Sequence, residues 1–264
     1  MSDPPPSVAF DRAAEYYDDT RGLTDEGVAR QTETLSAELG GRGRVLEVGV
    51  GTGQVALPLE AAGIPVLGLD LSRPMLDKLL GKVGARSPLP LAQGDATRLP
   101  FRDDTFGAAY LRWVLHLIPD WPTALAEIAR VVGGKGVVLV QQGAAGTESR
   151  QGEIRERFAE LAGVSFEPRG LTWSGYDELD QVMAALGAAA RSLPPFTDVE
   201  RDSLEEFIEG IVLNRYSWTW TIEDPGLLAG LADEVRRWAT DRFGPLDQVP
   251  RETYEITWRA YDLP

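Results

Sequence analysis

The middle of the chain alternates short apolar runs with longer stretches of mixed polarity. Each apolar run ends in a polar or small residue, as expected of a strand that is buried on both faces of a parallel sheet. These runs cover residues 44–48, 65–70, 89–95, 106–111 and 136–142. The stretches between them have helical length and cover 54–62, 73–83 and 120–132. Strand alternating with helix predicts a doubly wound α/β sheet.

The two flanks of this middle region are predicted to complete a single domain. Residues 10–39 have helix-like spacing, with Thr24 or Asp25 available as an N-cap. Further helices are predicted at 147–163, 175–187, 202–216 and 224–243, a sixth strand at 188–196 and a last strand at 251–264. We therefore expect a mostly parallel, seven-stranded sheet within one domain, 1–264. Its parts are a core at 10–142, helical insertions at 143–250 that cap the substrate site, and the last strand.

Composition removes several classes of function. The formal net charge of −15 disfavours nucleic acid and anionic membranes as partners, because proteins that bind phosphates usually present a basic face. The chain has no cysteine and one histidine, His116, so we predict no metal site. No apolar stretch is long enough for a membrane span. We expect a cytoplasmic protein, monomeric or homodimeric, that acts on a small molecule.

The stretch VLEVGVGTGQ, residues 45–54, places a glycine-rich turn directly after the first strand. A dinucleotide-binding turn requires G-x-G-x-x-G, but Gln54 stands where the third glycine should follow Gly49 and Gly51. Asp70 ends the next predicted strand, where a carboxylate can accept hydrogen bonds from both hydroxyls of a ribose. The pattern therefore predicts a nucleoside ligand without a pyrophosphate.

Glu47 indicates the charge of that ligand. A carboxylate repels a neighbouring pyrophosphate and attracts an ammonium or sulfonium group. Glu47 precedes the first glycine of the turn, so a nucleoside that carries positive charge fits better than one that carries phosphate. S-adenosylmethionine is such a nucleoside.

Four motifs in order resemble those of the class I S-adenosylmethionine-dependent methyltransferases. They read LEVGVGTGQ, GLDLSRPML, QGDATRLPF and AEIARVVGGKGVVLV. The similarity is greatest to the small-molecule branch that includes the ubiquinone and menaquinone biosynthesis methyltransferases, and it covers roughly residues 10–142. It implies a Rossmann-like fold and methyl transfer from S-adenosylmethionine to an O, N or C nucleophile, with S-adenosylhomocysteine as the product.

The resemblance also implies the residues of a cofactor site. At the methionine end they are Tyr17, Arg21, Glu47, Gly49 and Gly51, with Tyr17 and Arg21 closing over the carboxylate, and Gln54 and Arg112 are further cofactor-binding candidates. At the nucleoside end they are Asp70 for the ribose and Leu71, Met75, Asp95 and Ala96 for the adenine. Plainer roles remain open for several of these side chains: a helix cap for Asp70, a turn for Asp95, and packing or solvated charge for Tyr17 and Arg21.

The sequence departs from the resembled pattern at two places. Gly107 replaces the Asp that commonly follows the phenylalanine of the fourth strand, and Leu117 replaces the second histidine of an LHH motif. His116 is a candidate general base beside the methyl group, and it is equally a partly buried residue with its nitrogens satisfied locally. The aromatic residues of the last third are expected to be mostly core, with one or two in the substrate pocket. They are Trp173, Tyr176, Phe196, Tyr216, Trp218 and Trp220.

Two other functions remain open from the sequence. A chain with the same motifs could bind S-adenosylmethionine without transferring its methyl group. A nicotinamide-dependent oxidoreductase would also use a glycine turn of this kind, although it needs the glycine that Gln54 replaces.

Overall fold

A computed structural model describes residues 7–84, 89–141, 149–165, 168–172, 176–250 and 252–264. Its main sheet has seven strands in the order β3-β2-β1-β4-β5-β9-β6. Six strands run in the same direction, and β9 runs antiparallel to both of its neighbours. The strands are β1 (Val45–Val48), β2 (Val66–Asp70), β3 (Leu91–Gln93), β4 (Ala108–Arg112), β5 (Val137–Gln141), β6 (Ala189–Ser192) and β9 (Arg259–Asp262). The predicted mostly parallel, seven-stranded sheet is confirmed.

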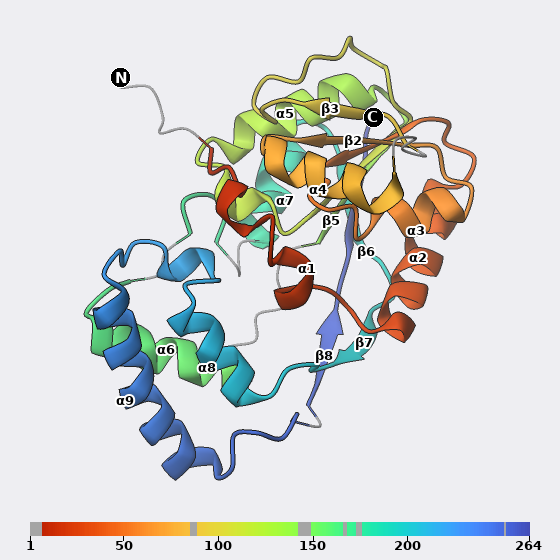
Figure 1. Ribbon diagram of the computed structural model, residues 1–264. Coiled ribbons are helices and arrows are strands. Elements are labelled where there is room, and N and C mark those ends of the chain that lie inside the picture. The colour runs from red at the N-terminus through yellow and green to blue at the C-terminus, as the bar shows by residue number, and fades with distance from the viewer. Residues whose placement is uncertain (1–6, 85–88, 142–148, 166–167, 173–175, 251) are drawn as a thin grey trace, which may run out of the picture.

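Helices cover both faces of this sheet (Figure 1). Apolar residues of α2 (Asp25–Leu39), α3 (Ala56–Ala61) and α4 (Arg73–Val83) join one core cluster, and those of α5 (Trp121–Val132) and α7 (Tyr176–Ala185) join another. The strands between them are apolar at successive positions because both of their faces are covered; every residue of β1, β4 and β5 is buried. The predicted helix at 73–83 matches α4 at both ends.

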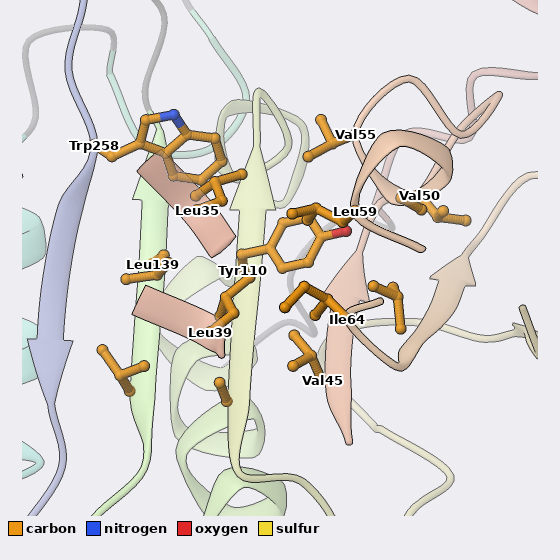
Figure 2. Packing of buried hydrophobic residues seen from close by; sticks show 14 of the residues in the cluster. Leu35, Leu39, Val45, Val50, Val55, Leu59, Ile64, Tyr110, Leu139 and Trp258 are labelled. Atoms are coloured by element: carbon orange, nitrogen blue, oxygen red, sulfur yellow. The ribbon is translucent and has the colours of Figure 1, made fainter. Parts of the chain in front are cut away.

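Tyr110 on β4 lies at the centre of the first core cluster. Figure 2 shows its ring among Leu39, Leu59 and Ile64, with Trp258 beyond it on the neighbouring part of the sheet. The Tyr110 and Trp258 rings meet edge to face, with centroids 6.5 Å apart. Such rings bury a large apolar area, and here they pack the centre of the sheet against α2 and α3.

The segment before the sheet is not one continuous helix. It comprises a short 3-10 turn η1 (Asp11–Ala13), the single turn α1 (Tyr17–Thr20) and α2. Residues 7–24, which precede α2, are termed the lead segment. Thr24 caps α2, because its side chain accepts a hydrogen bond from the Gly27 N–H. The buried carboxylate of Asp198 accepts from both the backbone and the hydroxyl of Thr24, so β7 (Phe196–Val199) is tied to the start of α2.

The predicted last strand at 251–264 is divided. Its first half, β8 (Thr253–Ile256), pairs with β7 in a separate two-stranded ribbon, and β9 enters the main sheet. Trp258 is 1% exposed and packs on Tyr110 where the chain leaves the ribbon for the sheet. Alternation of side chains continues across this corner, and for that reason the sequence pattern does not reveal it. Arg251 lies outside the described residues.

Three helices form a separate group beyond the carboxyl ends of the strands (Figure 1). They are α6 (Arg150–Ala162), α8 (Leu204–Val212) and α9 (Pro225–Phe243), and their apolar faces share a third core cluster. This group, here termed the cap, lies within residues 143–250, but α7, β6 and β7 of the same span pack on the sheet or belong to the sheet and the ribbon. No helix among the described residues is long and apolar enough to cross a membrane.

Gly107 gives a test of this packing. A Cβ at Gly107 would lie 1.7 Å from the backbone oxygen of Arg42, so no side chain fits there without movement of the chain. We expect Gly107→Ala to lower the free energy of unfolding by about 3 kcal/mol, measured by urea denaturation. Gly81→Ala is the control, because nothing lies within 4 Å of its Cβ position inside α4, and it should raise stability by up to about 1 kcal/mol. Equal stability of the two variants would contradict this packing.

Candidate active site

A cavity of about 750 Å³ lies between the carboxyl ends of the strands and the cap. Its floor includes Val48, Leu69 and Arg112, each at the end of a strand, and its far wall includes Tyr216 and Trp218. The carboxyl edge is where open α/β sheets bind ligands, since the loops that follow adjacent strands meet there. We call this space the main cavity.

The glycine turn after β1 forms one side of the main cavity. Gly49 and Gly51 both have positive φ, +78° and +53°, a conformation that residues with a Cβ rarely adopt. A Cβ on Gly49 would also lie 2.9 Å from the Val114 side chain. The turn thus presents bare backbone to the cavity, as the sequence predicts.

Asp70 fixes this turn to the end of β2. Its Oδ2 accepts a hydrogen bond from the Gly51 N–H at 2.7 Å, and its Oδ1 accepts from the Ser72 N–H at 2.8 Å. Burial raises the pKa of the Asp70 carboxyl, and these backbone hydrogen bonds oppose the rise. Ser72, not Asp70, caps α4 by accepting from the Met75 N–H. Asp70 lines the main cavity with acceptor capacity left for a ligand.

The residues predicted for the adenine gather at the same end of the cavity. Leu71, Met75, Asp95 and Ala96 all line it. One oxygen of Asp95 accepts hydrogen bonds from the backbone and the hydroxyl of Thr97. Asp95 therefore has the turn role that the sequence left open, and it also faces the cavity.

Tyr17 and Arg21 bring the lead segment to the cavity, and both line it. The Arg21 guanidinium donates to the Thr20 carbonyl and lies 5.1 Å from the centre of the Tyr216 ring. Burial raises the pKa of the Tyr17 phenol, which the Arg112 and Arg21 charges partly offset. The lead segment and the cap thus meet over the cavity at Arg21.

Arg112 is buried at the end of β4 and lines the main cavity. Its Nε donates to Gln141 and its Nη1 to the side-chain oxygen of Gln54, both at 3.2 Å. Gln54 does not line the main cavity. Its amide nitrogen donates to Asp18 and to the Arg21 carbonyl, so it joins the lead segment to the sheet.

Glu47 also does not line the main cavity. Register pairs Glu47 on β1 with Tyr110 on β4, and the Tyr110 hydroxyl donates to the Glu47 carboxyl at 2.8 Å. Glu47 is 2% exposed, and burial raises the pKa of its carboxyl to about 8. The side chain packs in the core beside Tyr110, and its expected interaction with a ligand remains a prediction.

His116 lies in a short 3-10 turn, Leu115–Leu117, and lines the main cavity. It is 8% exposed, and burial together with the Arg21 charge lowers the pKa of its imidazole to about 3. The ring is therefore neutral near pH 7 and a weak base. His116 is thus mostly buried and also faces the cavity, and its role there remains a prediction.

Several cavity residues were not predicted from the sequence. Ser7, Val8 and Phe10 come from the lead segment, Arg155 comes from α6, and Glu200, Arg201 and Asp202 come from the loop between β7 and α8. They carry no motif, and only the folded chain brings them to the cavity. The aromatic residues divide as expected: Tyr216 and Trp218 line the cavity, Tyr176 and Phe196 pack in the sheet cores, and Trp220 packs on Phe10. Trp173 lies outside the described residues.

The described part of the chain contains no group of three or more histidine or carboxylate side chains that could hold a metal ion.

The part of the chain that contains the glycine turn matches known sequences. Residues 46–140 match the profile of the methyltransferase domain family. The chain is 37% identical over 136 residues to a demethylmenaquinone methyltransferase of Streptomyces avermitilis. That match covers 50% of this chain and 57% of the relative, so the chain spans little more than half the length of that enzyme.

Solved structures share the fold across most of the chain. The cyclase SpnF superposes with a TM-score of 0.57 at 18% identity and covers 99% of both chains. A phosphoethanolamine N-methyltransferase of Haemonchus contortus, in complex with phosphomonomethylethanolamine and S-adenosylhomocysteine, gives a TM-score of 0.53 at 19% identity. It covers 89% of this chain and 52% of the other. The chain therefore shares the fold of these solved structures, and its residues 46–140 match the methyltransferase domain family.

Proposed function

We propose that this chain binds S-adenosylmethionine in the main cavity and transfers its methyl group to a small-molecule acceptor. The observation that carries the proposal is the pairing of a bare glycine turn with Asp70, which holds that turn and faces the cavity. Both lie within residues 46–140, the part of the chain that matches the methyltransferase domain. A cytoplasmic location, a monomeric or homodimeric state and the lack of a nucleic-acid partner remain predictions from the sequence.

The cavity residues fit the chemistry of this cofactor from end to end. Asp70 offers acceptor oxygens to the two ribose hydroxyls, and Leu71 and Met75 offer an apolar surface to the adenine. At the other end, Tyr17 and Arg21 offer a hydroxyl and a guanidinium to the methionine carboxylate. The glycine turn between the two ends lets the ligand approach the backbone closely.

The acceptor would occupy the part of the main cavity under the cap. Tyr216 and Trp218 stack there, with centroids 5.4 Å apart and planes within 5° of parallel. Bound S-adenosylmethionine supplies an activated methyl group on its sulfonium, so the chain's main task is to align the acceptor with it. The aromatic wall and the neighbouring His116 are placed to do this.

His116 contributes little to removing a proton from the acceptor. The imidazole of His116 has a pKa of about 3, far below the value near 7 that suits a general base at neutral pH. An acceptor that already carries a lone pair, or one that ionises readily, needs no stronger base. We infer that His116 positions the acceptor and shapes the cavity wall.

Two alternatives follow from the same geometry. The fold is shared with a cyclase, so cofactor binding without methyl transfer is the second candidate, and fold alone does not decide between them. A nicotinamide-dependent oxidoreductase is disfavoured, because Gln54 holds Asp18, Arg21 and Arg112 together in place of the third glycine of a dinucleotide turn.

Asp70→Ala tests cofactor binding. Loss of the ribose acceptor and of the Gly51 hydrogen bond should weaken binding of S-adenosylhomocysteine roughly 100-fold, measured by calorimetry. Asp77→Ala is the control, since Asp77 is an exposed carboxylate on α4 that pairs with Arg73, one turn before it. Unchanged affinity in a folded Asp70→Ala protein would refute the proposed site.

Glu47→Gln tests the buried carboxyl. The folded-state pKa of about 8 lies above the usual 4.5, so the protein is stabilised in the protonated form and loses stability as pH rises from about 4.5 to 8. The amide oxygen introduced by the substitution keeps an acceptor for Tyr110 and does not ionise. We expect the variant to melt at least about 2 °C above the natural protein at pH 8 and to show no such gain at pH 4.5.

The same carboxyl should respond to the ligand. The ammonium group of S-adenosylhomocysteine favours ionised Glu47, so affinity should rise between pH 6.5 and 8 with release of a proton. Calorimetry in buffers of different ionisation enthalpy measures that release, and Glu47→Gln should abolish it. Proton release that persists in the variant would assign the titration to another group.

His116→Gln tests the role of the imidazole. A radiolabelled-methyl screen of amines, phenols, quinol precursors and carboxylates identifies the acceptor first. Because the imidazole is neutral throughout pH 5 to 8, we expect no rate step at the ordinary histidine pKa and less than about a tenfold loss of kcat in the variant. A loss of about 1,000-fold, or more, with unchanged cofactor binding would show that His116 is the general base.

The same screen bears on the second candidate function. If the cofactor binds but no methyl transfer appears across the panel, cofactor binding without methyl transfer is favoured.

A further inference from the structure

A second cavity, of about 440 Å³, adjoins the main cavity behind the lead segment. It lies between α1, the start of α2 and the start of α3, and Gln31, Leu57 and Lys82 belong to its lining but not to that of the main cavity. Arg21, Arg112 and Arg201 line both spaces. The second cavity is therefore a separate space whose boundary with the main cavity is made of arginines.

The charges around this second cavity oppose the charge of the protein as a whole. Its lining has four cations, Arg21, Lys82, Arg112 and Arg201, and one carboxylate, Asp18, in a chain of net charge −15. Lys82 pairs with Asp18 at 2.7 Å. The three arginines form no ion pair within 4 Å with any carboxylate of the described residues, so the cavity has an excess of positive charge.

Two residues of this lining each have a buried side-chain atom without a hydrogen-bond partner among the described residues. The atoms are Nη2 of Arg112, a residue 9% exposed, and Oε1 of Gln31, a residue 2% exposed. A buried polar atom left unsatisfied costs about 1 to 3 kcal/mol, and more where the group is charged. Glu47, a buried carboxyl near Arg112 on the sheet, has a pKa near 8 and leaves the guanidinium charge uncompensated at neutral pH.

We propose that the second cavity binds a small organic anion that carries a hydroxyl group, at a site distinct from the cofactor site. The guanidinium groups would pair with a carboxylate or phosphate of the ligand, for which their planar donors are well suited. Gln31 would accept a hydrogen bond from the hydroxyl. The volume lies within the range of small-molecule pockets, so the ligand is larger than an inorganic ion.

The site lies beside the cofactor site and contacts the same lead segment. Gln54 joins Arg112 to the backbone of Arg21, and Lys82 joins Asp18 to the Thr52 carbonyl. An anion held between these side chains would fasten the lead segment to the sheet, and the same segment carries Tyr17 into the main cavity. We infer a ligand that binds at the same time as the cofactor.

Citrate and tricarballylate provide a matched pair of probes, because they differ only in the hydroxyl group. Calorimetry on the full chain at constant ionic strength should show saturable binding of citrate, and weaker binding of tricarballylate by roughly tenfold. With citrate at saturation, the dissociation constant of S-adenosylhomocysteine should change less than about threefold. No saturable binding of either anion would overturn the proposal.

Variants separate this site from the cofactor site. Gln31→Met replaces an unsatisfied amide by an apolar side chain of similar size, so it should fold normally, lose the preference for citrate and leave binding of S-adenosylhomocysteine unchanged. Arg201→Gln should weaken both anions. Arg44→Gln is the control, because Arg44 is exposed at the opposite, amino end of β1 and should alter neither ligand.

Competition between citrate and S-adenosylhomocysteine would contradict the proposal of a separate site. If the apparent dissociation constant of S-adenosylhomocysteine rises in proportion to citrate concentration, the anion occupies the methionine carboxylate position and the second site is refuted. Failure of S-adenosylhomocysteine to bind at all would refute the proposed function and leave the citrate measurement valid, so the two failures are distinguishable.

Discussion

The carboxylate of Asp70 is the acceptor on which the geometry of the main cavity depends. Its two oxygens hold the Gly51 N–H from one strand–helix turn and the Ser72 N–H from the next. Without that bridge, the glycine turn would keep its conformational freedom, since nothing within 4 Å limits a Cβ at Gly51. Ser72 then caps α4, which places Met75 under the cavity. One side chain thereby fixes the turn, the helix and the apolar surface that a nucleoside would contact.

A second network sets the other end of the cavity and joins elements far apart in sequence. Gln54, directly after the glycines, contacts Asp18 and Arg21 of the lead segment and Arg112 of β4. Arg21 then lies over the Tyr216 ring of the cap. The polar groups around the cavity therefore hold this part of the lead segment against both the sheet and the cap. A change of charge there, by a bound ligand or by titration, acts directly on the element that covers the cofactor site.

Sequence reasoning recovers what depends on local pattern. The five parallel strands, α4 and the positions of Gly49, Gly51 and Asp70 follow from apolar runs, turn residues and motif spacing. The split between β8 and β9 does not, because alternation of side chains continues through a corner set by packing of Trp258 on Tyr110. The position of Glu47 depends likewise on strand register, since only its pairing with Tyr110 turns the carboxyl away from the cavity. Arg155 and residues 200–202, which also line the cavity, carry no local signal.

Burial of charged side chains leaves unpaired positive charge at the cavities of this acidic chain. Burial makes the neutral form of Glu47 the stable one near pH 7, although the hydrogen bond that Tyr110 donates to the carboxyl opposes this effect. Burial also lowers the pKa of Arg112, but a guanidinium stays protonated at any physiological pH, so its charge persists where no carboxylate pairs with it. A buried guanidinium without a partner destabilises the folded protein, so we expect an anionic group to pair with Arg112 in the active protein. The anionic group of a ligand, either the methionine carboxylate or a separate organic anion, would pair with this charge. Arg112 is therefore the residue at which an anionic ligand is most needed.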